Sequence, residues 1–229
     1  LKNPKLRKLI DFYNTWYVPN NMALILVGDF DIEATKPLIE KTFGKLQARP
    51  LPERTKYPTT AFAQDERYSA KLGYMPELYI AYNGVPVGDK DELLLDFLGE
   101  ILSNSMQIGL LDELTLDNKL MYAGAANDVR RDQGRFLVIA VPYMDAETQT
   151  YTSLKETEQL VNEVIQQLVS GNISEELVEA VRQNFYQEFD RTMEYPEMKV
   201  QLLQNAFTYQ QSIEELLQQK ERVAAITMD

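Results

Sequence analysis

An unbroken apolar run, Met22–Val27, constrains the fold of this chain more than any other stretch. Turn-forming residues bound it on both sides, with Pro-Asn-Asn at 19–21 and Gly-Asp at 28–29. A short apolar run between two turns is typical of a strand covered on both faces, because neither of its sides is polar. We therefore predict a buried strand here, and this strand needs other parts of a protein to cover both of its faces.

Helices are predicted on either side of this strand. Apolar residues recur every three or four positions from Pro4 to Trp16, which is the spacing of one helical stripe. A second helix follows the strand, with Asp29 or Asp31 as its N-cap and Gly44 as its end. The residues of this helix predicted to face inward are Ile32, Leu38, Ile39 and Phe43.

A second structural unit is predicted to begin near Ser69, after a linker at residues 49–68 that contains three prolines and no sustained apolar period. The order of its elements predicts an α+β fold, in which an antiparallel-rich sheet is backed by helices on one face. Aromatic residues at strand or helix spacing are predicted to lie in the core: Tyr82, Phe97, Tyr186 and Phe207. Strands are expected at 77–82, 120–130 and 134–142, and helices at 89–102, 106–116, 150–169, from Ser174 onward, and at 198–225.

Composition excludes several classes of function. The net charge of −12, without a basic stripe, argues against nucleic-acid binding, which requires clustered Lys and Arg. No apolar run approaches the roughly 20 residues of a membrane-spanning helix. The chain has neither His nor Cys, so it cannot form a Ser–His or Cys–His catalytic pair. Zinc sites rely mostly on the same two residue types, and we predict no catalytic residue and no metal ligand in this chain.

The order of residues from Trp16 to Leu46 resembles the pitrilysin/insulinase family of zinc peptidases. The resemblance rests on the pattern aromatic-Tyr-x-Pro-x-Asn-Met-x-Leu-x-x-x-Gly-Asp-Phe-Asp, followed by a helix that ends in Phe-Gly-Lys-Leu. It continues in the second unit through the runs at 109–114 and 171–177, so it covers most of the chain. Proteins of this family consist of repeated α+β domains that close around a chamber enclosing the peptide.

The resemblance implies a division into domains. Residues 1–48 correspond to the C-terminal part of a first, metal-bearing domain, and 69–229 to a second domain that binds no metal. The zinc ligands of the family lie in an inverted H-x-x-E-H motif with a later Glu, which places them upstream of Leu1. We therefore expect a piece of a longer zinc metalloendopeptidase that is inactive alone. Its partners would be a peptide substrate and the rest of the polypeptide or a second peptidase half.

Two alternatives stay open at this stage. The longer protein could be a non-catalytic partner or scaffold of the same fold, since either kind would lack His in this stretch. A generic α+β binding domain is the third possibility, favoured if residues 69–229 lack a sheet of four-stranded type backed by paired helices. The compartment is undetermined; a protein without membrane spans is expected, and any targeting signal would precede Leu1.

Tyr122 is the one candidate substrate-binding residue. In the half of these proteins that lacks the zinc motif, an Arg and a Tyr seven residues apart contact the substrate. Tyr122 stands at the Tyr-like position, but Thr115 stands in place of the Arg, which favours the metal-carrying half. The competing interpretation of Tyr122 is a strand residue packed in the core or at a domain interface.

Three alternating carboxylates, Asp29, Asp31 and Glu33, resemble the start of a calcium-binding loop. However, Ala34 stands where such a loop needs Gly, and Glu40 is one position away from the final acidic ligand. Capping of the following helix is therefore the preferred interpretation.

Overall fold

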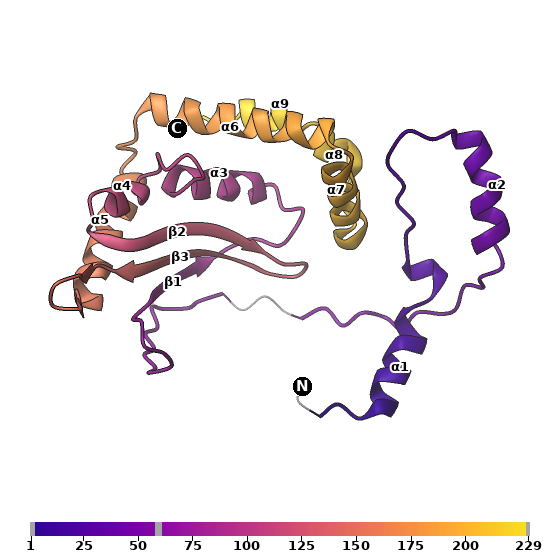
Figure 1. Cartoon of the computed structure of the whole chain (residues 1–229), viewed down its shortest axis with the longest axis horizontal. Coiled ribbons are helices and arrows are strands. Elements are labelled where there is room, and N and C mark those ends of the chain that lie inside the picture. Colours follow the sequence, from indigo (N-terminus) through magenta and orange to yellow (C-terminus); the bar gives the residue numbers. More distant parts are fainter. Residues whose placement is uncertain (1–2, 58–60, 228–229) are drawn as a thin grey trace. The chain divides into compact units, whose positions relative to one another are not determined.

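A computed structural model of the chain describes residues 3–57 and 61–227. The chain forms two compact units. The first unit comprises Leu1–Tyr57 and Arg191–Gln210, and the second comprises Pro58–Asp190 and Gln211–Asp229. Figure 1 labels the elements of both units along the chain.

The first unit consists of helices and extended chain. It contains α1 (Leu6–Trp16), a short 3-10 helix (Pro19–Asn21), α2 (Ile32–Phe43) and α7 (Pro196–Tyr209). Asp31 is the N-cap of α2, since its side chain accepts a hydrogen bond from the Ala34 N–H (2.9 Å), and Gly44 is the C-cap. Capping rather than calcium binding thus accounts for Asp31, and both predicted ends of this helix are confirmed.

The predicted strand at Met22–Val27 is wrong. Residues 22–27 form no strand, and the side chains of Met22, Leu24 and Leu26 are 55%, 53% and 46% exposed, while Ile25 and Val27 are half-buried. A strand requires a neighbouring strand to pair its N–H and C=O groups, and the described residues of this chain provide none here. Three of the residues predicted to face inward from α2, Ile32, Leu38 and Phe43, are exposed as well.

The second unit is built on an antiparallel sheet with the order β1-β3-β2, formed by β1 (Leu78–Asn83), β2 (Leu120–Val129) and β3 (Gly134–Pro142). This sheet has three strands within the described residues, against the four-stranded type expected. A two-residue pair, β4 (Met144–Asp145) with β5 (Thr150–Tyr151), follows it. The α+β fold with an antiparallel sheet is confirmed, as are the predicted strands at 120–130 and 134–142, which pair with each other as a hairpin.

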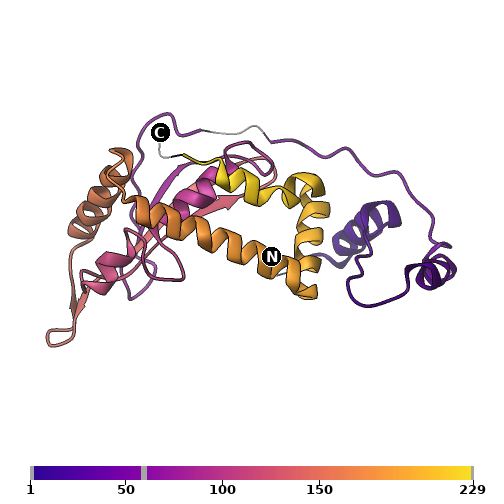
Figure 2. The ribbon, with the colours of Figure 1, turned by 90° about the horizontal axis from the view of Figure 1, so that it is seen from above.

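Most helices of the second unit lie over one face of this sheet, and α5 stands at one end of it (Figure 1). The helices of this unit are α3 (Glu92–Leu102), α4 (Asp112–Leu116), α5 (Leu154–Val169), α6 (Glu175–Glu194), α8 (Ile213–Leu217) and α9 (Gln219–Ala224), the end of α6 belonging to the first unit. In Figure 2, viewed from above, α6 crosses over the sheet. Arg182 on α6 donates hydrogen bonds to the carbonyls of Val223 and Ile226, which attaches the α9 end of the chain to α6.

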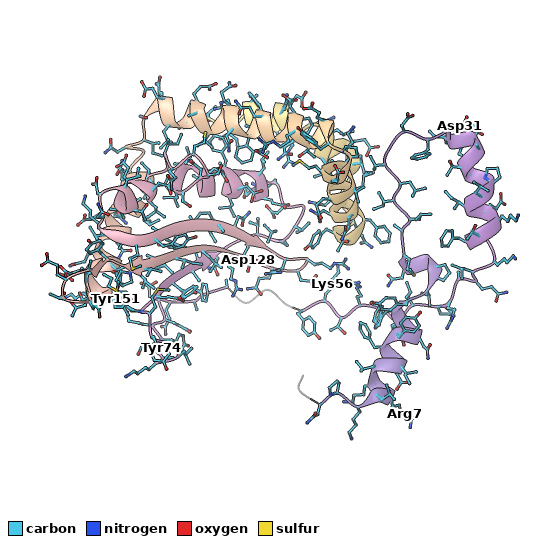
Figure 3. The ribbon with its side chains drawn as sticks, viewed as in Figure 1. Arg7, Asp31, Lys56, Tyr74, Asp128 and Tyr151 are labelled. Carbon is cyan, nitrogen blue, oxygen red and sulfur yellow. The ribbon has the colours of Figure 1, made fainter. Side chains whose placement is uncertain are left out.

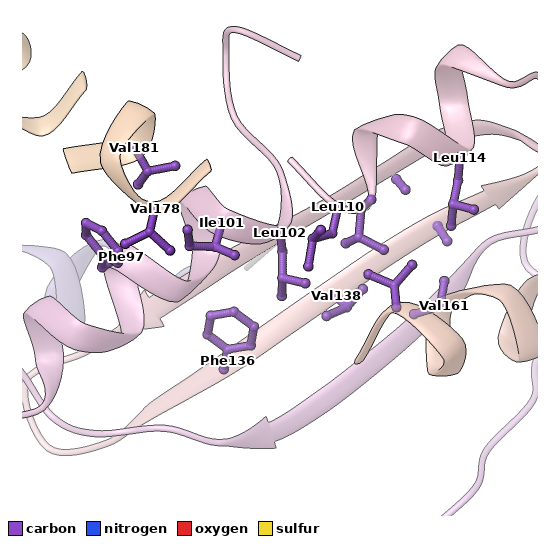
Figure 4. Close-up of a cluster of buried hydrophobic side chains, with 14 of the residues drawn as sticks. Phe97, Ile101, Leu102, Leu110, Leu114, Phe136, Val138, Val161, Val178 and Val181 are labelled. Carbon is purple, nitrogen blue, oxygen red and sulfur yellow. The ribbon is translucent and has the colours of Figure 1, made fainter. Parts of the chain in front are cut away.

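The core of the second unit lies between these helices and the sheet (Figure 4). Phe97, Ile101 and Leu102 from α3 meet Phe136 and Val138 from β3. The prediction of core aromatics is confirmed for Phe97, and Tyr186 packs against the cluster. The prediction is wrong for Tyr82 and Phe207, whose rings are exposed.

Local hydrogen bonds shorten two predicted helices. The helix expected at 106–116 forms only as α4, because the Asp112 carboxylate accepts from the N–H groups of Asn104 and Gly109 and holds the preceding loop. The helix expected at 150–169 begins at Leu154, after a capping box in which Ser153 and Glu156 each accept from the other's backbone N–H. In the predicted linker at 49–68, the described residues contain no helix or strand, and 58–60 lie outside the described part.

Candidate functional site

Tyr122 lies near the start of β2, next to a β-bulge. The register of β2 with β3 shifts between Leu120 and Tyr122, so that Tyr122 stands opposite Val141. From there the strand alternates regularly, and a bulge at this point re-aims the residues that follow it. The Tyr122 side chain is 52% exposed. Its predicted place in a strand is therefore correct, but packing within the core is not.

Alternation along β2 sends its residues to two different faces of the sheet. Ala123 and Ala125 join the core cluster, and the Asn127 amide donates to the Glu92 carbonyl on α3. Tyr122 and every second residue after it point to the other face.

This second face of the sheet carries apolar side chains that lie outside the core cluster, and one of them, Val141, is itself buried. This face is defined here as the open face, and its residues are Tyr79 and Ala81 from β1, Tyr122, Gly124 and Ala126 from β2, and Leu137, Ile139 and Val141 from β3. Across the three strands, Tyr79, Ile139 and Gly124 form one row, and Ala81, Leu137 and Ala126 form the next. Leu137 and Ile139 are half-buried in the middle, while Tyr79 is 59% exposed at the edge.

The ring of Tyr122 lies along the open face over Gly124. A Cβ atom added at Gly124 would stand 2.6 Å from the Tyr122 hydroxyl oxygen and 3.1 Å from its Cζ. Gly124 is buried although it belongs to the open face, which agrees with cover by this ring. The Tyr122 hydroxyl has no hydrogen-bond partner among residues 3–57 and 61–227.

Charged groups border the open face at the turn between β2 and β3. Asp128 accepts from Arg135 Nε (2.9 Å) and pairs with Arg130 Nη2 (2.6 Å), and Figure 3 labels it on the β2 side of this turn. At the other end, the Tyr79 hydroxyl donates to Glu77 (2.8 Å), and this hydrogen bond raises the pKa of Tyr79. The open face is thus an apolar strip with ion pairs at its turn end, and the Tyr122 hydroxyl on it has no partner among the described residues.

On the helix-covered face of the sheet, α3 and β2 share a half-buried polar pair that no sequence pattern predicted. Asn127 Nδ2 donates to Asp96 Oδ1 (2.9 Å), and burial raises the pKa of Asp96 to about 6 despite that hydrogen bond. The Asn127 Oδ1 atom is buried and has no partner among the described residues. Burial also raises the pKa of Glu100, one turn further along α3. This pair faces the helices, away from Tyr122.

Zinc does not fit the residues of this chain. The sequence contains neither His nor Cys, and no three acidic residues in the described part of the chain lie close enough together to hold a metal ion. Thr115, at the position where the resemblance would place an Arg, donates to the Asp112 carbonyl within α4. A zinc site of the usual kind, built on His or Cys, therefore cannot form from these 229 residues alone.

Comparison with known proteins places this arrangement in a family. The model of the peptidase M16 inactive domain matches residues 5–185, which is most of the chain. The chain belongs to this family. Membership in the peptidase M16 inactive domain family confirms the pitrilysin/insulinase resemblance and excludes the generic binding domain.

Curated relatives of this M16 inactive domain include two proteins of Escherichia coli. Protein YhjJ is 40% identical over 67 residues, which is 28% of this chain and 14% of YhjJ. The protein named "Probable zinc protease PqqL" is 43% identical over 54 residues, 24% of this chain and 6% of PqqL. This chain therefore aligns with only a small part of either relative.

Solved structures share the fold. A protease from Helicobacter pylori superposes with a TM-score of 0.76 at 20% identity, covering 99% of this chain and 55% of that one. A peptidase M16 inactive domain from Pseudomonas fluorescens gives 0.74 at 15% identity, covering 98% and 52%. This M16 inactive domain thus spans about half the length of these two structures. Among its described residues, no helix is both long and apolar enough to cross a membrane.

Proposed function

We propose that this chain is part of a zinc-dependent metalloendopeptidase and supplies chamber wall and domain packing around a peptide substrate. Residues 69–229 would be the second, non-metal domain, and the open face with Tyr122 would contact the peptide. The observation that carries this proposal is the open face itself: an apolar sheet surface, whose Tyr122 hydroxyl has no hydrogen-bond partner in the described part of the chain, occurs here on a peptidase M16 inactive domain.

The zinc would be held by the rest of the protein. We propose that residues 1–48 complete a metal-bearing domain whose ligands lie upstream of Leu1, joined through the linker at 49–68. The exposed apolar run Met22–Leu26 supports this, since an unpaired apolar segment is stabilised when a neighbouring strand satisfies its backbone and covers its side chains. The name of the relative PqqL, a probable zinc protease, is in agreement.

Activity assays on two proteins test the proposal. The 229-residue chain should neither bind zinc nor cleave a quenched fluorescent peptide. The natural polypeptide that contains it should cleave this peptide, lose activity with a chelator and regain it with zinc. In that longer protein, Tyr122→Phe should lower kcat/KM about fivefold, the effect of about 1 kcal/mol from one hydrogen bond, without changing zinc content.

The second candidate function is a non-catalytic partner or scaffold of the same fold. The absence of His from this chain is compatible with it. An inactive longer protein that binds no zinc would establish this alternative and overturn the proposed peptidase role. Zinc-dependent cleavage by the 229-residue chain alone would contradict the placement of the ligands upstream.

A further inference from the structure

We infer that Gly124 is a positioning residue for Tyr122: the missing side chain at 124 lets the Tyr122 ring lie flat along the open face, where its hydroxyl is presented to an extended peptide. This inference rests on the proposed function, in which Tyr122 contacts the substrate. It adds a residue to that site and states the chemistry of the peptide that the site would take.

The backbone of β2 does not explain why position 124 is a glycine. Gly28, Gly88 and Gly171 have positive φ values, which favour glycine, but Gly124 does not. A glycine inside a strand weakens it, since it loses more conformational entropy and packs no side chain. We therefore attribute the glycine at 124 to the space that its missing side chain leaves above the Cα, which offsets the loss of strand stability.

That space is occupied by Tyr122. The atom nearest to a Cβ at position 124 would be the Tyr122 hydroxyl oxygen at 2.6 Å, a separation that Cβ contacts essentially never show, and the next two are ring carbons of the same residue. An alanine at 124 would push the ring away from the sheet rather than disturb the backbone. The Tyr122 side chain is the flexible partner, because it is half-exposed and its hydroxyl is not held by a hydrogen bond within the described chain.

With the ring flat, its hydroxyl reaches the row of Gly124, Ile139 and Tyr79. The hydroxyl is then the polar group placed over the apolar strip formed with Leu137. A phenol hydroxyl can donate to a peptide carbonyl, while Ile139 and Leu137 offer a surface for an apolar side chain. The site thus fits an extended peptide with two features: a backbone carbonyl that accepts from the Tyr122 hydroxyl, and a nearby apolar side chain that packs on Ile139 and Leu137. A charged side chain would not fit this apolar surface.

Nuclear magnetic resonance of the 229-residue chain tests this. The probes are acetyl-Ala-Leu-Ala-Leu-Ala-amide and its matched Ser version, acetyl-Ala-Ser-Ala-Ser-Ala-amide. The variant Gly124→Ala should move the Tyr122 ring signals and weaken binding of the Leu peptide about three- to tenfold, comparable to the loss of one hydrogen bond. The control Gly73→Ala should change neither, because a Cβ at Gly73 meets nothing within 4 Å and its φ is not positive.

A double-mutant cycle separates positioning from a merely structural effect. In a Tyr122→Ala background, Gly124→Ala should alter peptide affinity less than about 1.5-fold, since the ring it displaces is gone. Circular dichroism would confirm that each variant folds.

The outcomes distinguish this inference from the proposed function. If Tyr122→Ala weakens binding but Gly124→Ala leaves the ring signals and affinity unchanged, the positioning role is overturned and the substrate contact stands. If the Leu peptide binds no better than the Ser peptide, or Tyr122→Ala has no effect, the substrate contact at the open face is overturned. Both the positioning role and the substrate contact are supported if two results occur together. Gly124→Ala moves the Tyr122 ring signals, and it weakens peptide binding in the parent chain but not in the Tyr122→Ala background.

Discussion

The two units of this chain use apolar residues in opposite ways. In the second unit, a continuous cluster between α3, β3 and the neighbouring helices is shielded from solvent, with Leu102 and Val138 almost fully buried. In the first unit, Val18 and Ala206 are the buried apolar residues among those described, and Met22, Leu24 and Phe43 are open. Burial of apolar surface is the main favourable term in folding, so the second unit has a core of its own and the first needs further surface to cover it.

The comparison also shows that a helix can have a well-defined N-terminus without packing against a core. Both α2 and α5 have side-chain caps at their N-termini, yet only α5 contributes residues to the core cluster. Local capping fixes where a helix begins, whereas tertiary packing decides how much stability it gains.

The largest expected effect compares two leucines. Leu102→Ala should lower the free energy of unfolding by about 3 kcal/mol, because it leaves a cavity in the packed core. Leu24→Ala should cost about 0.5 kcal/mol or less in the 229-residue chain, since this side chain is already in solvent. Denaturant titration of both variants measures the difference.

The same two variants, Leu24→Ala and Leu102→Ala, also test whether the rest of the protein covers the first unit. In the natural longer protein, Leu24→Ala should cost about 2 kcal/mol or more, since an upstream domain would bury this side chain. An equal, small cost in both proteins would contradict that placement. An equal, large cost of Leu24→Ala and Leu102→Ala in the 229-residue chain would remove the contrast between the units.

A pH-dependent effect comes next in size and is confined to the second unit. The folded pKa of Asp96, about 6, lies above the ordinary 3.8, so the folded state binds this proton more tightly than the unfolded state. The stabilising contribution is complete below pH 3.8 and is lost as the pH rises through 6. Near pH 8 the ionised, buried carboxylate should cost about 3 kcal/mol relative to pH 3.

Asp96→Asn should remove this cost while keeping an acceptor for Asn127. The variant should be more stable than the parent chain at pH 8 and about equal to it near pH 4, as measured by urea unfolding at each pH. Asp31→Asn in the first unit is the matched control and should leave this pH dependence unchanged. A stability difference for Asp96→Asn that does not vary with pH would contradict the burial argument.

The smallest expected effect compares the two helix caps. Ser153→Ala removes the capping box of α5 and should cost about 1 kcal/mol of global stability. Asp31→Ala removes the cap of α2, and we expect about fivefold faster amide exchange in α2 without a shift of the global unfolding midpoint, because this helix adds nothing to the core. Hydrogen exchange with mass spectrometry measures both; a lower midpoint for Asp31→Ala would mean that α2 unfolds together with the core.

The sequence by itself determined the elements whose causes are local. The turn at 19–21, the caps at Asp31 and Ser174, the end of α2 at Gly44 and the β2–β3 hairpin were all predictable, because each follows from a short run of residues. The absence of His and Cys likewise excluded a self-contained zinc site of the usual kind. The family resemblance also rests on short local runs. Because such runs occur in both units, the resemblance covers most of the chain.

Only the tertiary structure decided which apolar stripes are covered. The pattern at Met22–Val27 indicates a buried strand, but burial depends on a neighbour that these 229 residues do not provide within their described part. The pairing of Asp96 with Asn127, 31 residues apart, could not be predicted from either neighbourhood. Tyr122 and Gly124 are two residues apart, yet their contact became visible only once the bulge and the register of β2 set which face they share. Periodicity states that a side of an element is apolar; the packing of distant segments decides whether that side becomes core or an open surface.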